Sequence, residues 1–117
     1  MAAELAANPV FRGLDEETIA LLASQALRRE AGPGDVLFLE GEPSAGLYLL
    51  ESGSVKVVKS SAQGREQALQ FIGPGELFNI IGIFSGRPNP ATAIALEPSV
   101  AWLLPRQDAQ LRIAPHL

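Results

Sequence analysis

Short apolar runs separated by turn-forming residues fill the chain after Gly34, and their spacing constrains the fold more than any other feature. The runs recur at intervals of about ten residues, which is typical of antiparallel β-sandwiches and barrels. The segments between them contain Gly, Pro or polar clusters, which tolerate the backbone geometry of tight turns. We therefore predict a mainly β fold, an antiparallel β-roll or jelly-roll barrel. Its strands are expected at residues 36–39, 47–50, 55–59, 67–72, 92–96 and 100–104.

The N-terminal part of the chain has a helical pattern instead. Asp15 is a suitable N-cap residue, and the two glutamates after it favour the positive end of the helix dipole. Arg28 and Arg29 precede a Gly-Pro-Gly turn, where positive charge favours a helix C-terminus. The apolar face of this helix would comprise Ile19, Leu22, Ala23 and Ala26. We expect a helical segment over residues 1–31 and the β-roll over residues 32–105.

The length of the chain favours a single domain, because 117 residues are enough to bury roughly two-thirds of the unfolded surface. Residues 106–117 follow the last predicted strand and resemble the start of another helix. Leu111 and Leu117 are its candidate core-facing positions. The sequence ends before such a helix is complete, so we interpret the chain as a fragment of a longer protein.

Two stretches depart from simple strand alternation. Within residues 55–59, Lys56 and Lys59 lie three positions apart, which a β-bulge or an exposed edge would explain. From Leu77 to Gly86 the apolar residues are too continuous for alternation and favour a short buried helix or a strand-to-helix transition. A helix inside a β-roll is unusual, and it marks this stretch for function.

The sequence also contains one internal similarity. Gly32-Pro33-Gly34-Asp35 resembles Gly73-Pro74-Gly75-Glu76. Two copies of one tight corner would suit a roll with approximate symmetry, whereas a coincidence between two Pro-Gly turns would have no structural meaning. The sequence leaves both interpretations open.

Composition excludes several classes of function. A net charge of −4 argues against nucleic-acid binding by these residues, which would need a basic face. There are no cysteines, so disulfides and thiolate metal sites are ruled out. His116 is the single histidine and cannot build a metal site or a catalytic triad alone. We expect no enzyme activity and no metal. Haem with one axial histidine is conceivable, but a surface histidine is the simpler interpretation.

No apolar run approaches the ~20 residues that a membrane span needs, and the N-terminus has no signal-peptide pattern. A cytoplasmic location without membrane contact is therefore expected.

Taken together, the glycine framework resembles the cyclic-nucleotide-binding domain, and most closely the sensor domain of bacterial transcription regulators of the Crp/Fnr type. The first half of the resemblance lies in Gly32-Pro33-Gly34-Asp35-Val36-Leu37-Phe38, Gly41-Glu42-Pro43 and residues 47–57. The second half lies in Gly73-Pro74-Gly75-Glu76, Gly82-Ile83-Phe84 and residues 90–97. The resemblance implies a β-roll followed by a long dimerisation helix, of which residues 106–117 would be the beginning, and then a DNA-binding domain that is missing from this chain.

The resemblance also implies a pocket between Gly75 and Thr92. In relatives that bind cyclic nucleotides, backbone N–H groups of a short helix hold the phosphate, a glutamate accepts from the ribose, and an arginine with a neighbouring hydroxyl contacts the phosphate. The helix would lie at residues 79–84. The glutamate position falls on Ile80, and the arginine and hydroxyl positions fall on Pro90 and Ala91.

All three side-chain determinants are therefore replaced, and cyclic-nucleotide binding is doubtful. Arg87 could approach a phosphate and Thr92 could supply a hydroxyl, but a solvated arginine and an ordinary strand threonine are the simpler interpretations. Glu76 would stabilise the turn at Gly73-Pro74-Gly75. The candidate ligand-binding residues are Gly75, Glu76, Asn79, Ile80, Ile81, Gly82, Arg87, Pro90, Ala91 and Thr92. Their apolar character favours either an apolar or planar effector or a pocket filled by its own side chains.

We therefore expect the effector-sensing domain of a Crp/Fnr-type regulator, with an unknown small-molecule effector and DNA binding only through a missing C-terminal domain. The full-length protein would be a homodimer. The alternative is a regulatory module of the same fold attached to a protein that does not bind DNA, such as a kinase or a channel.

Overall fold

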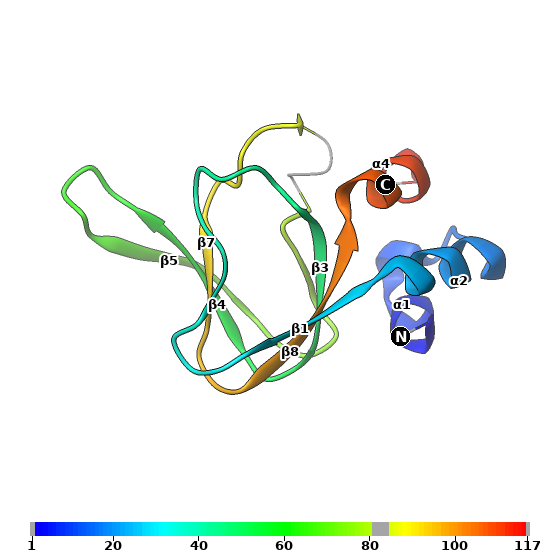
Figure 1. Ribbon diagram of the computed structural model, residues 1–117, viewed down its shortest axis with the longest axis horizontal. Coiled ribbons are helices and arrows are strands. Elements are labelled where there is room, and N and C mark those ends of the chain that lie inside the picture. The colour runs from blue at the N-terminus through cyan, green and yellow to red at the C-terminus, as the bar shows by residue number, and fades with distance from the viewer. Residues whose placement is uncertain (1, 81–84, 117) are drawn as a thin grey trace.

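The computed structural model describes residues 2–80 and 85–116 and shows two antiparallel sheets with the helices beside one of them (Figure 1). The strands are β1 (Leu27–Ala31), β2 (Val36–Phe38), β3 (Gly46–Ser52), β4 (Val55–Ser60), β5 (Glu66–Ile72), β6 (Leu77–Phe78), β7 (Thr92–Ala95) and β8 (Ser99–Pro105). The helices are α1 (Ala2–Ala7), η1 (Pro9–Phe11), α2 (Glu16–Gln25), α4 (Arg106–Arg112) and η2 (Ala114–His116). The predicted mainly β antiparallel roll is confirmed.

The two sheets have the strand orders β1-β8-β3-β6 and β2-β7-β4-β5. Strand β3 is buried on both faces, which explains its unbroken apolar run. Leu47 and Leu49 pack with the helices on one side, whereas Tyr48 and Leu50 belong to the core between the sheets. The helices thus cover the outer face of one sheet and form the first core with it. The inner faces of both sheets form the second core, and the pocket opens beside it.

The predicted helical segment over residues 1–31 is correct only up to Gln25. Helix α2 begins after Asp15, whose carboxylate accepts from the Thr18 backbone N–H at 2.8 Å as an N-cap. Residues 27–31 form strand β1 instead, paired with β8. Arg28 and Glu30 form an ion pair on its exposed side, as residues two apart on a strand can. Pairing with the edge of β8 outweighs the local helical preference, because β8 would otherwise expose unpaired backbone groups.

The C-terminal helix differs from the prediction in its buried face. Leu111 was expected to face the core but is 74% exposed. Ala109 and Ile113 are buried instead and pack in the cluster with the N-terminal helices. Ile113 is the C-cap residue of α4 and lies four positions after Ala109, so the two lie on the same side of the last turn, and Leu111 points away from it. Leu117 lies outside the described residues.

The two Gly-Pro-Gly-acid segments have the same structure. Gly34 and Gly75 both have φ of +86°, a conformation that favours glycine. In each corner the acidic side chain accepts from the first glycine's N–H, from Gly32 to Asp35 at 2.8 Å and from Gly73 to Glu76 at 2.9 Å. The second glycine of each corner also donates its N–H to a neighbouring strand, from Gly34 to Ala95 O at 2.8 Å and from Gly75 to Leu50 O at 2.7 Å. The similarity is therefore a repeated corner and not a coincidence.

Candidate functional site

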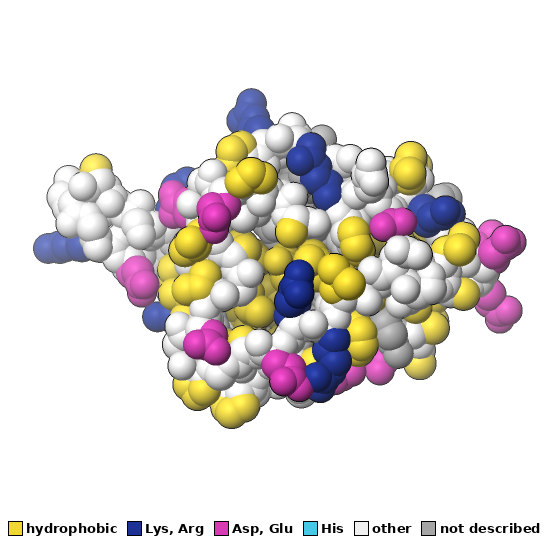
Figure 2. Space-filling model, viewed as in Figure 1, with side chains coloured by type: hydrophobic (Ala, Val, Ile, Leu, Met, Phe, Trp, Pro, Cys, Tyr) yellow, Lys and Arg dark blue, Asp and Glu magenta, His cyan; other side chains and the backbone are white. Residues whose placement is uncertain are grey.

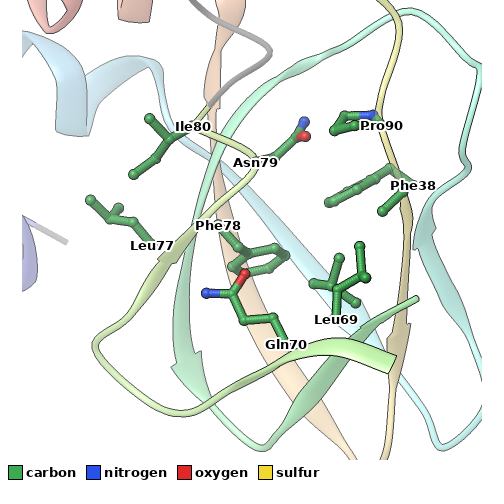
Figure 3. A pocket seen from close by; sticks show the side chains of 10 residues that line it. Phe38, Leu69, Gln70, Leu77, Phe78, Asn79, Ile80 and Pro90 are labelled. Atoms are coloured by element: carbon green, nitrogen blue, oxygen red, sulfur yellow. The ribbon is translucent and has the colours of Figure 1, made fainter. Parts of the chain in front are cut away.

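A pocket of about 310 Å³ opens between the β4–β5 pair, strand β6 and the segment that leads into β7 (Figure 3). Its lining is mostly apolar, with two carboxamide side chains. The lining residues are Phe38, Val57, Leu69, Gln70, Leu77, Phe78, Asn79, Ile80, Pro90 and Ala91. Among the described residues that line it, none carries a charge.

Aromatic rings form one wall of the pocket. Phe38 and Phe78 stack with centroids 6.1 Å apart, and both contact Tyr48 at 5.2 Å. Tyr48 is buried behind them, and this burial raises the pKa of its hydroxyl, an effect that the positive charge of Arg29 partly offsets. The phenol is therefore neutral at physiological pH, and this wall presents no charge.

A β-bulge shapes the opposite side. Val57 pairs with Gln70, but Val58 pairs with Ala68, so Leu69 is an extra residue in β5. The irregularity that the spacing of the lysines predicted in residues 55–59 is therefore a bulge. Strand β4 itself lies between β7 and β5 and is not an edge.

Asn79 joins the pocket to the surrounding loops. Its backbone φ of 67° is left-handed, so the predicted helix does not begin at Asn79. Its side-chain nitrogen lies within hydrogen-bond distance of Ser44 Oγ at 3.3 Å, Gly46 O at 3.2 Å and Asn89 Oδ1 at 3.1 Å. Asn89 is buried, and its own amide donates to Leu39 O at 3.0 Å. These contacts hold Asn79 in place, and the other residues of the predicted helix, 81–84, lie outside the described residues.

The structure brings some of the predicted site residues together. Asn79, Ile80, Pro90 and Ala91 all line the pocket. Ile81 and Gly82 fall outside the described residues.

The other predicted residues lie away from the pocket lining or have structural partners. Glu76 holds its corner, and the carbonyl of Gly75 accepts from Asn8 Nδ2 at 2.9 Å. Thr92 Oγ1 accepts from the Glu40 N–H at 2.9 Å, and Arg87 is exposed on the loop. The simpler interpretations of Glu76 and Thr92 therefore agree with their contacts.

Sequence reasoning missed the contribution of β2, β4 and β5 to the pocket. Phe38, Val57, Leu69 and Gln70 were assigned to strands without a functional role. The lysine spacing in β4 was the one signal that pointed to this side, because it indicated a bulge. It could not show which strand carried the extra residue.

Charges elsewhere on the protein are dispersed. Figure 2 shows Lys and Arg scattered over the visible face, while hydrophobic side chains gather near its centre. Lys56 pairs with Glu66 at 3.3 Å across the β4–β5 pair. Within the described part of the chain, no cluster of three or more His, Cys, Asp or Glu side chains could hold a metal ion. None of the helices in that part has the length and hydropathy to cross a membrane.

A sequence comparison decides the family. The family model described as "Cyclic nucleotide-binding domain" matches residues 28–113. The chain belongs to this family. This cyclic nucleotide-binding domain is homologous to Crp/Fnr-type transcription regulators, as the resemblance implied.

Individual relatives of the cyclic nucleotide-binding domain come from proteins of different kinds. It is 34% identical over 101 residues to the cyclic AMP receptor protein of Thermus thermophilus, covering 86% of this chain and 47% of that protein. It is 36% identical over 102 residues to acetyltransferase Pat of Mycolicibacterium smegmatis, covering 87% of this chain and 30% of that protein. The chain therefore spans about half, or less, of the length of the curated relatives it matches.

Among solved structures, the cyclic nucleotide-binding domain is similar to the N-terminal domain of a transcriptional regulator from Streptomyces coelicolor. The TM-score is 0.81 at 36% identity, and the match covers 96% of this chain and 80% of that one. That chain is itself the N-terminal domain of a regulator, so the match covers most of a single domain.

Proposed function

We propose that this domain is the effector-sensing unit of a transcription regulator and that its working effector is not a cyclic nucleotide. The supporting observation is that the described lining of the pocket carries no charge. Pro90 and Ala91 occupy the positions where the family pattern has the arginine and hydroxyl that contact the phosphate, and Ile80 occupies the glutamate position.

The expected loss of affinity follows from the missing contacts. A hydrogen bond that involves a charged group contributes about 1.5–3 kcal/mol. Losing the contacts of both the arginine and the glutamate removes about 3–6 kcal/mol, which corresponds to a 10²- to 10⁴-fold weaker affinity. Backbone N–H groups alone would leave binding in the millimolar range or weaker.

Calorimetric titration with cyclic AMP and cyclic GMP tests this proposal. The wild-type chain is expected to show no micromolar binding of either. Pro90→Arg restores the charge at an exposed position and should tighten cyclic AMP binding by about 10- to 100-fold. Pro90→Gln is the matched control, since it removes the same proline without adding charge. Micromolar binding of a cyclic nucleotide by the wild type would refute the proposal.

For the whole protein, we propose a cytoplasmic homodimer that binds DNA through a further domain. The homology to Crp/Fnr-type regulators supports this assignment. The relative that is an acetyltransferase keeps open the alternative of a regulatory module attached to a protein of another activity. Sequencing the gene beyond residue 117 discriminates the two: a helix-turn-helix supports the regulator, whereas a catalytic or membrane segment supports the alternative. Light scattering of the 117-residue chain at several concentrations tests dimerisation, and a monomer throughout would assign the dimer contact to other residues.

A further inference from the structure

The bulge in β5 gives the pocket its exposed polar group. Successive residues of a regular strand point to opposite faces, so Leu69 and Gln70 would normally be separated. Because Leu69 is the extra residue, both side chains line the pocket. Figure 3 shows them rising side by side from β5 toward Phe78. Bulges often redirect side chains beside binding sites, and this one places an amide in an apolar lining.

The two carboxamides of the pocket have different environments. The Asn79 nitrogen lies against three acceptors and is held by the protein itself. The Gln70 side chain is exposed and makes no hydrogen bond to any described residue. Gln70 therefore offers both a donor and an acceptor to a molecule that enters the pocket.

The rest of the lining limits the charge and shape of that molecule. An anion entering the pocket would lose hydration without gaining a cationic partner from the described lining, and this loss is costly. The stacked rings of Phe38 and Phe78 favour a flat molecule, because aromatic faces pack well against other planar groups. A pocket of about 310 Å³ lies at the lower end of the roughly 300–1,000 Å³ range of ligand pockets, so one or two rings would fill it.

We infer that the pocket takes a small, neutral, planar and mainly apolar molecule, one edge of which exchanges hydrogen bonds with the Gln70 carboxamide. This inference rests on the proposed function, since it assigns the effector class of the same pocket. It adds Gln70 as the residue that determines specificity for a polar edge.

Two probes of almost identical shape test the charge preference. The complete chain, labelled with ¹⁵N, is titrated with 2-naphthamide and with 2-naphthoate, and binding is followed by amide chemical shifts. We expect 2-naphthamide to shift the signals of pocket-lining residues and to bind at least about 10-fold more tightly than the anion, which would be buried without a counter-charge.

Variants on β5 test the role of Gln70. Gln70→Leu should weaken 2-naphthamide binding by about 2- to 10-fold while leaving the weak binding of 2-naphthoate unchanged. Gln67→Leu is the matched control, because Gln67 is also exposed on β5 but does not line the pocket. Thermal unfolding of both variants confirms that they are folded.

Three results would overturn the inference: equal or tighter binding of 2-naphthoate, no effect of Gln70→Leu, or no binding of 2-naphthamide within the pocket. None of these results depends on the cyclic-nucleotide titration. The exclusion of cyclic nucleotides can therefore stand if the neutral-ligand inference fails, whereas micromolar cyclic AMP binding would refute the proposed function whatever the naphthalene probes do.

Discussion

The side chain and backbone of Asn79 make separate contributions to stability, and two substitutions separate them. Its amide nitrogen lies 3.1 Å from Asn89 Oδ1 and 3.2 Å from Gly46 O, while its φ is 67°. Asn79→Ala removes the donor and places an ordinary residue in the left-handed region. Asn79→Gly also removes the donor, but glycine adopts this conformation without steric strain.

The magnitudes follow from these two terms. Asn89 is 3% exposed, so water cannot readily replace the lost donor. A buried polar group left without its partner costs about 1–3 kcal/mol. The left-handed conformation adds about 1–2 kcal/mol for a residue with a Cβ atom, and asparagine tolerates it better than alanine. We expect Asn79→Ala to lower the free energy of unfolding by about 2–4 kcal/mol and Asn79→Gly by about 1 kcal/mol less.

Urea unfolding measures both variants, with fluorescence of Trp102, the single tryptophan, as the signal. With a slope of about 2 kcal/mol per M, the alanine variant should unfold at a midpoint about 1–2 M below the wild type. The order of stability should be wild type, then glycine, then alanine. A glycine variant less stable than the alanine variant, or an alanine variant within about 0.5 kcal/mol of the wild type, would refute the reasoning.

Two further predictions concern a crowded turn and a buried hydroxyl. Gly53→Ala should lower the free energy of unfolding by several kcal/mol more than Gly64→Ala in thermal unfolding. Both glycines have positive φ, but of the two only Gly53 would place a Cβ against other atoms, among them Ser99 Oγ. Equal costs for the two variants would contradict this. The pKa of Tyr48, the only tyrosine, should lie above the ordinary value of about 10 when tyrosinate absorbance is titrated. The contribution of the neutral Tyr48 hydroxyl to stability is therefore complete below pH ~10 and is lost as the pH rises through the folded-state pKa. Tyr48→Phe should consequently lose less stability at alkaline pH than the wild type. An unchanged alkaline loss would contradict the assignment.

Most strands could be predicted from sequence because the turn residues between them have local geometric requirements. Strand β6 (Leu77–Phe78) was not among them, because its two apolar residues run on into the continuous apolar stretch that follows. Strand β1 could not be predicted either, because Leu27–Ala31 continues the helical pattern and becomes a strand only by pairing with β8. The same reason explains why Gln70 was missed. Whether a side chain faces the pocket depends on the register between β4 and β5, and the bulge at Leu69 changes that register by one residue.

Four pocket residues outside the strands, Asn79, Ile80, Pro90 and Ala91, were proposed from the family pattern, which relates positions along the chain. That pattern could show that Pro90 and Ala91 replace polar residues. It could not show that these residues belong to an apolar pocket, because the lining comes from strands far apart in sequence. The sequence thus showed which residue type stands at each position, but only the fold shows which side chains line the pocket together.

The repeated corner gives the sequence similarity a functional meaning. In each corner the second glycine donates its N–H to a neighbouring strand, and a short strand begins two residues later, β2 after Gly34 and β6 after Gly75. Each of these strands ends on a phenylalanine, Phe38 or Phe78, and the two rings stack at the pocket wall. Strand β2 is one residue longer, and its pairing with β7 shifts register between Val36 and Phe38, which accommodates the difference. Since a Cβ at Gly34 or Gly75 would meet no other atom, both glycines are required by φ and not by space. The two corners therefore fix the backbone that brings both halves of the aromatic wall together.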